Sequence, residues 1–386
     1  MKNMKKLFAM MLMLASVFFF ACDDDEENVM APEDAKAAME EVGGKMATTM
    51  EEMQDVEGIK VMGVLMNLPD PFTATSKSNA RTSVIPNINR FLLPTQPERT
   101  KSAYEVTEFD FDTYKGVYTY HNTPYPYWNF VPGGSVIEIN FPSDTADMET
   151  NDAKLTIYNY DEISITYYDD YYGEYYDEYY PTNIHADLKL NSVEIVDISL
   201  TASWVTTGDA AGEPTSLDIS VYLIPFEFTG EFNHSGNSAS VDFTIKYESN
   251  IVFAAGLGAA FTTTDMEETP LNINGKLQLF NVKFVASVDL KDIETIMYNM
   301  QQYQSEEAIV SALNAEISAY VLVDGIKAAD IKLAMSSLAM PYDLPFDIVF
   351  VYGDGTSESA LPYFAEFGED LDSFFTFLDD FYGDWK

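Results

Sequence analysis

The sequence is poor in the residues that most often carry catalysis or covalent cross-links. Its 386 residues include one cysteine and three histidines. A single cysteine excludes a disulfide within the chain, so the folded part has to be stabilised by its apolar core. The histidines are far apart in the sequence and belong to no zinc-protease or serine-hydrolase motif; they are His121, His185 and His234.

Basic residues are also scarce. Lys and Arg number 21 against 63 Asp and Glu, which gives a formal net charge of −42. This balance excludes nucleic acid as a partner, because binding to a phosphate backbone needs clustered Lys and Arg. It argues against electrostatic attachment to an anionic membrane for the same reason. The charge indicates either a solvated, self-repelling surface or a role in binding cations.

The carboxylates themselves predict no site. Asp110 and Asp112 lie two residues apart but lack the further oxygen ligands of a calcium loop. Carboxylate pairs suited to glycoside hydrolysis occur by chance in a chain this acidic, so finding them carries no information. We therefore predict no catalytic residue, no metal and no cofactor, and a chain that is not an enzyme. A glycan-active hydrolase stays as an alternative.

A long hydrophobic run is missing as well. The apolar run near the N-terminus, Leu7–Phe20, is too short to span a bilayer comfortably and matches the apolar part of a secretory signal. Three lysines precede it, as in the positive region of such signals: Lys2, Lys5 and Lys6. We predict that residues 1–21 form a signal peptide.

The single cysteine follows this run directly. Ala21 and Cys22 resemble the lipobox of bacterial lipoproteins, and Phe19 stands where that family carries Leu or another aliphatic residue. The resemblance implies that Cys22 is acylated after cleavage and anchors the chain to outer-membrane lipid. The alternative is an ordinary signal peptide with an incidental cysteine. Cleavage removes three lysines and no acid, so the charge would fall from −42 to −45. Such a chain needs a covalent anchor to stay at an anionic surface.

An acidic stretch comes next. It resembles the export signal of Bacteroidetes-type surface-exposed lipoproteins, and consists of Asp23, Asp24, Asp25, Glu26 and Glu27. The resemblance implies an outer-membrane location, with the protein facing the cell exterior. The alternative is that residues 22–30 are a solvated tether, because a run of like charges repels itself and extends.

The remainder predicts one mainly β domain of the α+β kind, residues 31–386. Residues 31–68 have helical spacing, with an apolar stripe at Met39, Val42, Met46, Met50 and Met53. Residues 73–103 predict a long loop, and residues 115–288 alternate with period two. We expect a large, curved antiparallel sheet built of hairpins. Helices at the N-terminus, at about 290–314 and at the C-terminus should pack on one of its faces.

A weak internal repeat lies within this pattern. Residues 188–200 and 321–333 superpose without a gap, and their turns fall at Asn191-Ser192 and Asp324-Gly325. Residues 277–290 form a looser copy, one residue longer. The repeat indicates either a duplicated binding unit or hairpins of one sheet that look alike.

A tyrosine-rich stretch, YYDDYYGEYYDEYY at 167–180, is the densest candidate site. It is interpreted as a glycan platform, as a calcium site made by its carboxylates, or as a hairpin that turns at Gly173. Our predicted ligand-binding residues are Tyr171, Tyr172, Tyr175 and Tyr176. Separately, Asp144-Thr145-Ala146 resembles an O-glycosylation acceptor of Bacteroidetes proteins, which makes Thr145 a predicted modification site.

These features favour a non-catalytic, lipid-anchored surface protein with a binding or structural role and a glycan or protein ligand. The alternative is a carrier or sensor of apolar ligands, held in a cavity between a curved sheet and Met- and Phe-rich helices.

Overall fold

The computed structural model describes residues 30–69, 71–74, 111–169, 174–208, 211–263, 270–335 and 346–365. The predicted signal peptide, Cys22 and the acidic stretch lie outside the described residues, as does most of the predicted loop 73–103. In the described part, no helix combines the length and apolarity needed to span a membrane.

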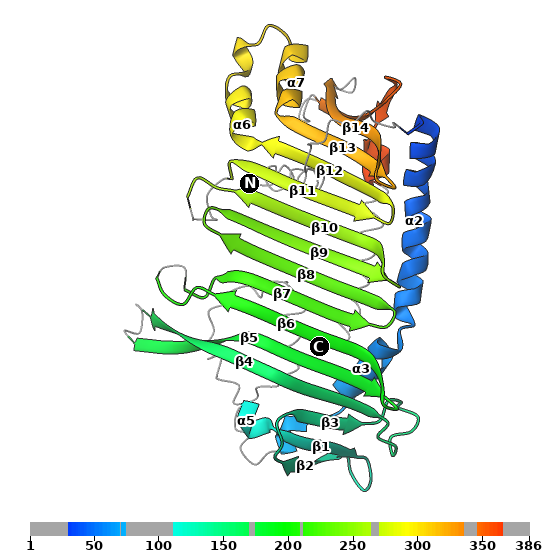
Figure 1. The fold of residues 1–386 in the computed structure, drawn as a ribbon, viewed down its shortest axis with the longest axis vertical. Helices are drawn as coiled ribbons and strands as arrows, with labels where there is room; N and C mark the ends of the chain where they lie inside the picture. Colours follow the sequence, from blue (N-terminus) through cyan, green and yellow to red (C-terminus); the bar gives the residue numbers. More distant parts are fainter. Residues whose placement is uncertain are drawn as a thin grey trace. The chain divides into compact units, whose positions relative to one another are not determined.

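The protein is mainly β, as predicted, and the strands of its described residues form one open sheet of 16 strands (Figure 1). All but one of the neighbouring pairs are consecutive in the chain, because the order across the sheet is β16 to β3 without interruption, then β1 and β2. The exception is the parallel pair of β1 and β3. The sheet is therefore mixed at this one place, whereas the prediction made it wholly antiparallel.

The first half of the sheet contains β1 (Gly116–His121), β2 (Tyr127–Pro132), β3 (Ile137–Phe141), β4 (Ala153–Asp169), β5 (Glu174–Leu190), β6 (Val193–Trp204), β7 (Pro214–Leu223) and β8 (Phe226–Ser235). The second half contains β9 (Ser238–Tyr247), β10 (Asn250–Ala260), β11 (Asn272–Leu279), β12 (Val282–Asp289), β13 (Ile317–Val323), β14 (Ile326–Met335), β15 (Phe346–Tyr352) and β16 (Ser357–Ser359).

Four helices fall where the sequence predicts them: α2 (Pro32–Gln54), α3 (Glu57–Asn67), α6 (Leu290–Tyr298) and α7 (Glu306–Ala315), with the 3₁₀ turn η2 (Met300–Gln302) between the last two. The 3₁₀ turn η1 (Pro71–Ala74) and the short helix α5 (Phe111–Tyr114) were not predicted. Ser305 caps the N-terminus of α7, because its hydroxyl accepts a hydrogen bond from the Ala308 amide at 3.3 Å. Residues 361–365 begin the predicted C-terminal helix, whose continuation lies outside the described residues.

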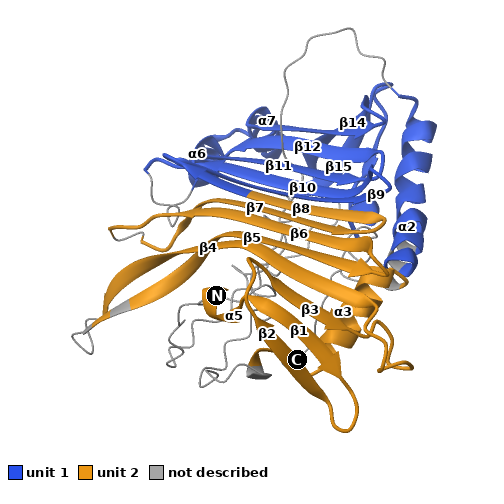
Figure 2. Ribbon diagram, turned by 60° about the horizontal axis from the view of Figure 1, so that its bottom comes forward, with its two compact units in different colours: residues 1–53, 232–384, 386 blue, residues 54–231, 385 orange. Residues whose placement is uncertain are grey.

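Two compact units divide the chain, with the boundary inside β8 (Figure 2). In the unit of residues 54–231, α3 lies against the apolar face of the sheet through Val61 and Leu65. Burying each of these side chains stabilises the unit by about 1.5–3 kcal/mol. Gly58 permits the close approach, since a Cβ at this position would lie 2.7 Å from the Val196 side chain. Phe72 completes the cover, with its ring 5.0 Å from Tyr114 and 5.4 Å from Tyr118.

Three hairpins share one turn and one β-bulge. Their two-residue turns have positive φ at both positions: Asn191-Ser192, Glu248-Ser249 and Asp324-Gly325. In each hairpin the register then shifts by one residue on the second strand, at Ile195, Val252 and Ala328. Each of these residues is buried together with the residue that follows it. A bulge therefore places two consecutive side chains on the core face.

Residues 188–200 and 321–333, the two members of the predicted repeat, thus share the same turn and the same β-bulge. Its third member is β9–β10, which the sequence comparison missed. Residues 277–290 pair without a register shift, so this predicted copy has the strand pattern but not the bulge.

In the unit of residues 30–53 and 232–365, α2 runs alongside the turn ends of several hairpins (Figure 1). Met39, Val42, Met46 and Met53 are buried along it, while the Met50 side chain is not among those described. The Lys45 ammonium lies 5.9 Å from the centre of the Phe280 ring, at the β11–β12 turn.

A carboxylate at the edge of this unit holds three elements together. Glu358 on β16 receives the Lys36 ammonium of α2 at 2.8 Å and hydrogen bonds from the Tyr352 and Tyr363 hydroxyls. Burial would raise the pKa of Glu358, but these donors outweigh it and lower the pKa below the usual value. Burial, and then the hydrogen bond to Glu358 and its charge, raise the pKa of Tyr363 to about 12.

Replacing this carboxylate by its neutral isostere tests the network. We expect Glu358→Gln to lower the free energy of unfolding by about 1–2 kcal/mol at pH 7, because charge-assisted hydrogen bonds are lost at a partly exposed site. A carboxyl whose pKa is lowered by folding stabilises the protein above its unfolded pKa, and this contribution is lost as the pH falls through the folded pKa. The difference between the two proteins should therefore shrink in acid. Urea unfolding at neutral and acidic pH measures it. Glu294→Gln, which removes an exposed charge on α6, is the control and should show neither effect.

Candidate functional site

Strands β4 and β5 extend beyond their neighbours as a two-stranded arm. They pair from Ala153–Leu190 to Asp169–Glu174, whereas β3 pairs with β4 only over residues 153–157 and β6 pairs with β5 only over residues 183–190. We call residues 161–169 and 174–183 the tyrosine arm. Figure 2 shows it as the long orange pair of strands that projects past β6. Isolated two-stranded ribbons are marginal in water, so the arm needs support from its side chains.

One face of the arm supplies this support. Tyr180 packs on Trp204 with ring centres 4.8 Å apart, and its hydroxyl donates to Glu178 at 2.6 Å. The hydroxyl of Tyr167 lies 2.9 Å from that of Tyr180 and donates to the carbonyl of Ala211 in the β6–β7 loop, also at 2.9 Å. Burial, followed by the hydrogen bond to Glu178, raises the pKa of Tyr180. These two tyrosines support the arm, and the hydroxyl of Tyr180 remains protonated.

The other face of the arm is open to solvent. Tyr168 and Tyr175 lie directly opposite each other, with ring centres 4.9 Å apart and planes tilted by 53°. Their exposed fractions are 53% and 75%, which is high for large aromatic side chains. The next pair along the arm is Thr166 and Asp177, joined by a hydrogen bond of 2.6 Å. Flat apolar rings beside a hydroxyl and a carboxylate can stack on a sugar ring and bind its hydroxyl groups.

The structure describes only part of the predicted tyrosine site. Tyr171, Tyr172 and the predicted turn at Gly173 lie outside the described residues. Tyr176 pairs with Tyr167 through its backbone, but its side chain is not described. Tyr175 is exposed on the open face. Tyr168 was not predicted, and the cross-strand register that makes it the partner of Tyr175 could have been found by assuming a hairpin centred between residues 171 and 172.

Other predicted positions and the histidines are spread over the molecule. Thr145 is exposed in the turn between β3 and β4, where Asp144 accepts a hydrogen bond from the Ala146 amide at 2.9 Å. His121 stacks on Tyr127, His185 packs against Tyr158, and His234 lies on β8. Among the described residues, no group of three or more His, Cys, Asp and Glu is placed to hold a metal ion.

A polar cluster surrounds Asp187 on the solvated face of β4–β6. Asp187 is almost completely buried, stands directly opposite Asp197, and binds the Lys189 ammonium at 3.0 Å. Burial, and then the charges of Asp197 and Asp187, raise the pKa of the Tyr158 hydroxyl. The hydrogen bond to Asp187 raises the pKa of Lys189, which stays charged. Lys189 and Asp187 form an ion pair, so Lys189 is not a neutral amine that could act as a base or nucleophile.

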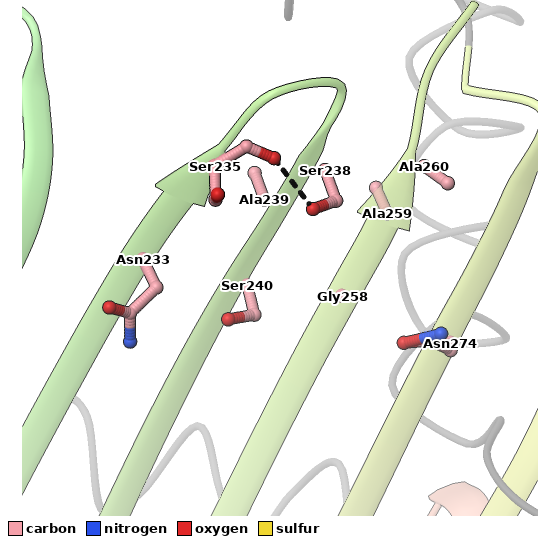
Figure 3. Close-up of a pocket in the computed structure, with 9 residues that line it drawn as sticks. All are labelled: Asn233, Ser235, Ser238, Ala239, Ser240, Gly258, Ala259, Ala260 and Asn274. Carbon is pink, nitrogen blue, oxygen red and sulfur yellow. Dashed lines mark hydrogen bonds between the residues drawn. The ribbon is translucent and has the colours of Figure 1, made fainter.

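A shallow hollow lies across β8–β11 (Figure 3). Gly258 and Ala260 lie in its floor, and small polar side chains surround it, including Asn233, Ser240 and Asn274. A Cβ at Gly258 would lie 2.5 Å from the side-chain oxygen of Asn274, so glycine leaves the space for that amide. Amides and hydroxyls make this hollow suitable for water or sugar hydroxyl groups rather than for an apolar ligand.

The contact between the arm and the β6–β7 loop predicts an unusual sensitivity at Gly212. A Cβ there would lie 1.9 Å from the Tyr167 hydroxyl oxygen, and φ is +86°. Gly208 has φ of +88° in the same loop, with open space around it. We expect Gly208→Ala to cost about 1–2 kcal/mol for its backbone conformation, and Gly212→Ala to cost at least about 1 kcal/mol more from overlap.

Thermal or urea unfolding of both variants measures the difference. In a Tyr167→Phe background, which removes the overlapping oxygen, the extra cost at Gly212 should fall. Equal costs at the two glycines, or no rescue by Tyr167→Phe, would contradict the described contact.

Comparison with known proteins leaves the function to be argued from these residues. No family model, curated protein sequence or solved structure matches the chain.

Proposed function

We propose that this chain is a lipid-anchored cell-surface protein that binds glycans without catalysing their cleavage. The observation that carries the proposal is the exposed pair Tyr168 and Tyr175 on the open face of the tyrosine arm. Aromatic rings exposed to this extent lose apolar hydration when they are covered, and tyrosine offers a flat surface with a polar tip at little entropic cost. A projecting arm brings the pair to a large ligand such as a polysaccharide.

Charge narrows the ligand class. The chain carries −42 overall, and Asp177 lies on the same face of the arm as the two rings. An acidic polysaccharide would be repelled, whereas a neutral glycan can donate a hydroxyl group to this carboxylate. The ligand we propose is therefore a neutral glycan.

The anchoring part of the proposal rests on the sequence. The lysines, the apolar run and the Ala21-Cys22 pair support acylation at Cys22. The stretch Asp23–Glu27 supports export to the outer face of the outer membrane. A protein held outside the cell by acyl chains is placed to meet extracellular glycans.

The non-catalytic part rests on how the candidate groups are arranged. His121 and His185 each pack on a tyrosine, on two different strands, and Lys189 is paired with Asp187. The hollow of Figure 3 does not favour the carrier alternative, because it is lined by polar and small side chains. The binding role is the one that a specific exposed feature favours.

Removing the aromatic pair tests glycan binding. A printed array of neutral and acidic glycans should show binding of the wild-type chain to neutral members. The double variant Tyr168→Ala/Tyr175→Ala should bind these at least about tenfold more weakly, because two stacking contacts of about 1 kcal/mol each are lost. Tyr168→Phe/Tyr175→Phe should keep most of the affinity.

Tyr298→Ala removes a tyrosine that is exposed on α6 and serves as the matched control. Unchanged thermal unfolding would show that the arm variants are folded. A wild-type chain that binds no glycan, or a double variant that binds as well as the control, would refute the tyrosine pair as the contact surface.

The anchor has its own test. In cells fed an alkyne-labelled fatty acid, the wild-type chain should carry the label and pellet with the outer membrane. Cys22→Ser should lose both, because the thiol is the acylated group. Replacing Asp23–Glu27 by Asn and Gln should keep the label but reduce labelling of the chain from outside the cell. Retained acylation in Cys22→Ser would contradict the lipobox assignment.

A further inference from the structure

The two edges of the sheet differ in how they are protected. Edge strands expose unpaired backbone groups and invite further strands, so proteins shorten them, charge them or cover them. At one edge, β16 has only three residues, carries the paired Glu358, and is followed by the helical residues 361–365. At the other edge, β2 has six residues, no charge and, among the described residues, no strand on its outer side.

The stretch of sequence that contains β2 is also uncharged. From Gly116 to Ile137 no residue is Asp, Glu, Lys or Arg, although the chain carries −42. Charged groups lie at its border, among them Glu149, which accepts a hydrogen bond from Thr123 in the β1–β2 turn. Val131 and Tyr127 are 56% and 46% exposed here. Two copies of an acidic protein repel each other over most of their surfaces, and an uncharged, apolar corner is where they can approach. A basic partner would be expected to use an acidic surface instead.

The backbone of β2 presents two donors outward. Gly133 donates its amide to the Lys115 carbonyl at 3.2 Å, and the register of β1 with β2 continues without a shift. Alternate residues of an antiparallel strand point to the same neighbour. The backbone N–H and C=O groups of Val131 and Asn129 therefore point to β1, and those of Trp128 and Phe130 point away from the sheet. Proline, which has no N–H, occupies the outward positions on both sides, Pro126 and Pro132.

We propose that β2 pairs antiparallel with β2 of a second copy of this chain, with Asn129 opposite Asn129. In this register Trp128 of each copy lies opposite Phe130 of the other, and the two outward N–H groups of both copies are satisfied in four hydrogen bonds. Pro126 of each copy lies opposite Pro132 of the other, and since proline has no N–H, no backbone donor is left unpaired there. Shifting the register would place an amide against a proline.

The side chains fit the same register. Tyr127 of one copy lies opposite Val131 of the other on the exposed face, which is a favourable aromatic and β-branched pair. On the core face, Trp128 lies opposite Phe130. Phe130 stacks on Tyr118 at 4.5 Å, and Trp128, which is 7% exposed, is held within its own chain by a 2.6 Å hydrogen bond from its indole N–H to the Pro69 carbonyl. Both faces of the new strand pair would therefore be apolar or aromatic, apart from the central asparagines.

Cysteine substitution tests the register of the two β2 strands directly. Residues opposite each other without mutual hydrogen bonds have Cα atoms about 4.5 Å apart, within the range of a disulfide. Full-length Asn129→Cys in detergent should therefore form a covalent dimer under mild oxidation. In Val131→Cys the two residues 131 would be offset by four positions, about 13 Å along the strands, so this matched control should stay uncross-linked. The wild-type chain controls for Cys22.

A charge variant tests whether the edge is needed for association. We expect the wild-type chain to sediment as a dimer and Asn129→Lys to dimerise about tenfold more weakly, because two like charges would face each other. Val193→Lys adds the same charge at an exposed position on β6 and should dimerise like the wild type. Equal thermal unfolding of the variants excludes misfolding as the cause.

Three results would overturn the proposal. A wild-type chain that is monomeric up to its solubility limit would show that the edge is free or is covered by another part of the chain or another protein. Equal cross-linking of Asn129→Cys and Val131→Cys would refute the register. A dimer unaffected by Asn129→Lys would place the interface elsewhere.

Discussion

Backbone hydrogen bonding between consecutive strands is the constraint on which this structure depends. Except at the parallel pair of β1 and β3 and at the two edges, each described strand satisfies its N–H and C=O groups with the strand before it and the strand after it, so the sheet grows hairpin by hairpin. Such pairing is local in sequence and needs no disulfide, which suits a chain with one cysteine. The same rule creates the edge problem, because a sheet that does not close must end in two strands with unpaired groups. Short β16 and proline-flanked β2 are two different answers to it.

The bulged hairpins connect this backbone rule with the core. A strictly alternating strand gives one side chain in two to the core, whereas each bulge gives two consecutive ones, such as Ile195 and Val196. The Ile195 and Val196 pair lies where α3 comes closest, at Gly58. The tyrosine arm extends beyond the neighbouring strands, so it cannot be stabilised by pairing with them. Tyr167, Tyr180 and Trp204 support it on one face, and the other face is open to solvent.

Much of the fold could be predicted from single residues and their spacing. The Asp324-Gly325 turn follows from the φ that both positions need, and Ser305 was recognisable as a cap from its place before α7. The parallel pair of β1 and β3 could not be predicted, since pairing of strands that are not consecutive leaves no local pattern. Tyr168 was missed for a similar reason, because its role depends on the residue opposite it on the neighbouring strand. Tyr175 was chosen from the composition of the stretch 167–180 alone.

Periodicity, charge and cysteine count are properties of the residues, so the class of structure and the acidic, disulfide-free character of the chain follow from the sequence. The proposed location also rests on the sequence, through the resemblance of residues 1–27 to a signal peptide, a lipobox and an export signal. Which tyrosines are exposed and which support the arm follows from the folded structure. It alone decided that Asp187 lies opposite Asp197 and that β2 ends the sheet. These facts depend on register and on neighbouring strands, and a residue's neighbours across a sheet are set by folding rather than by its position in the chain.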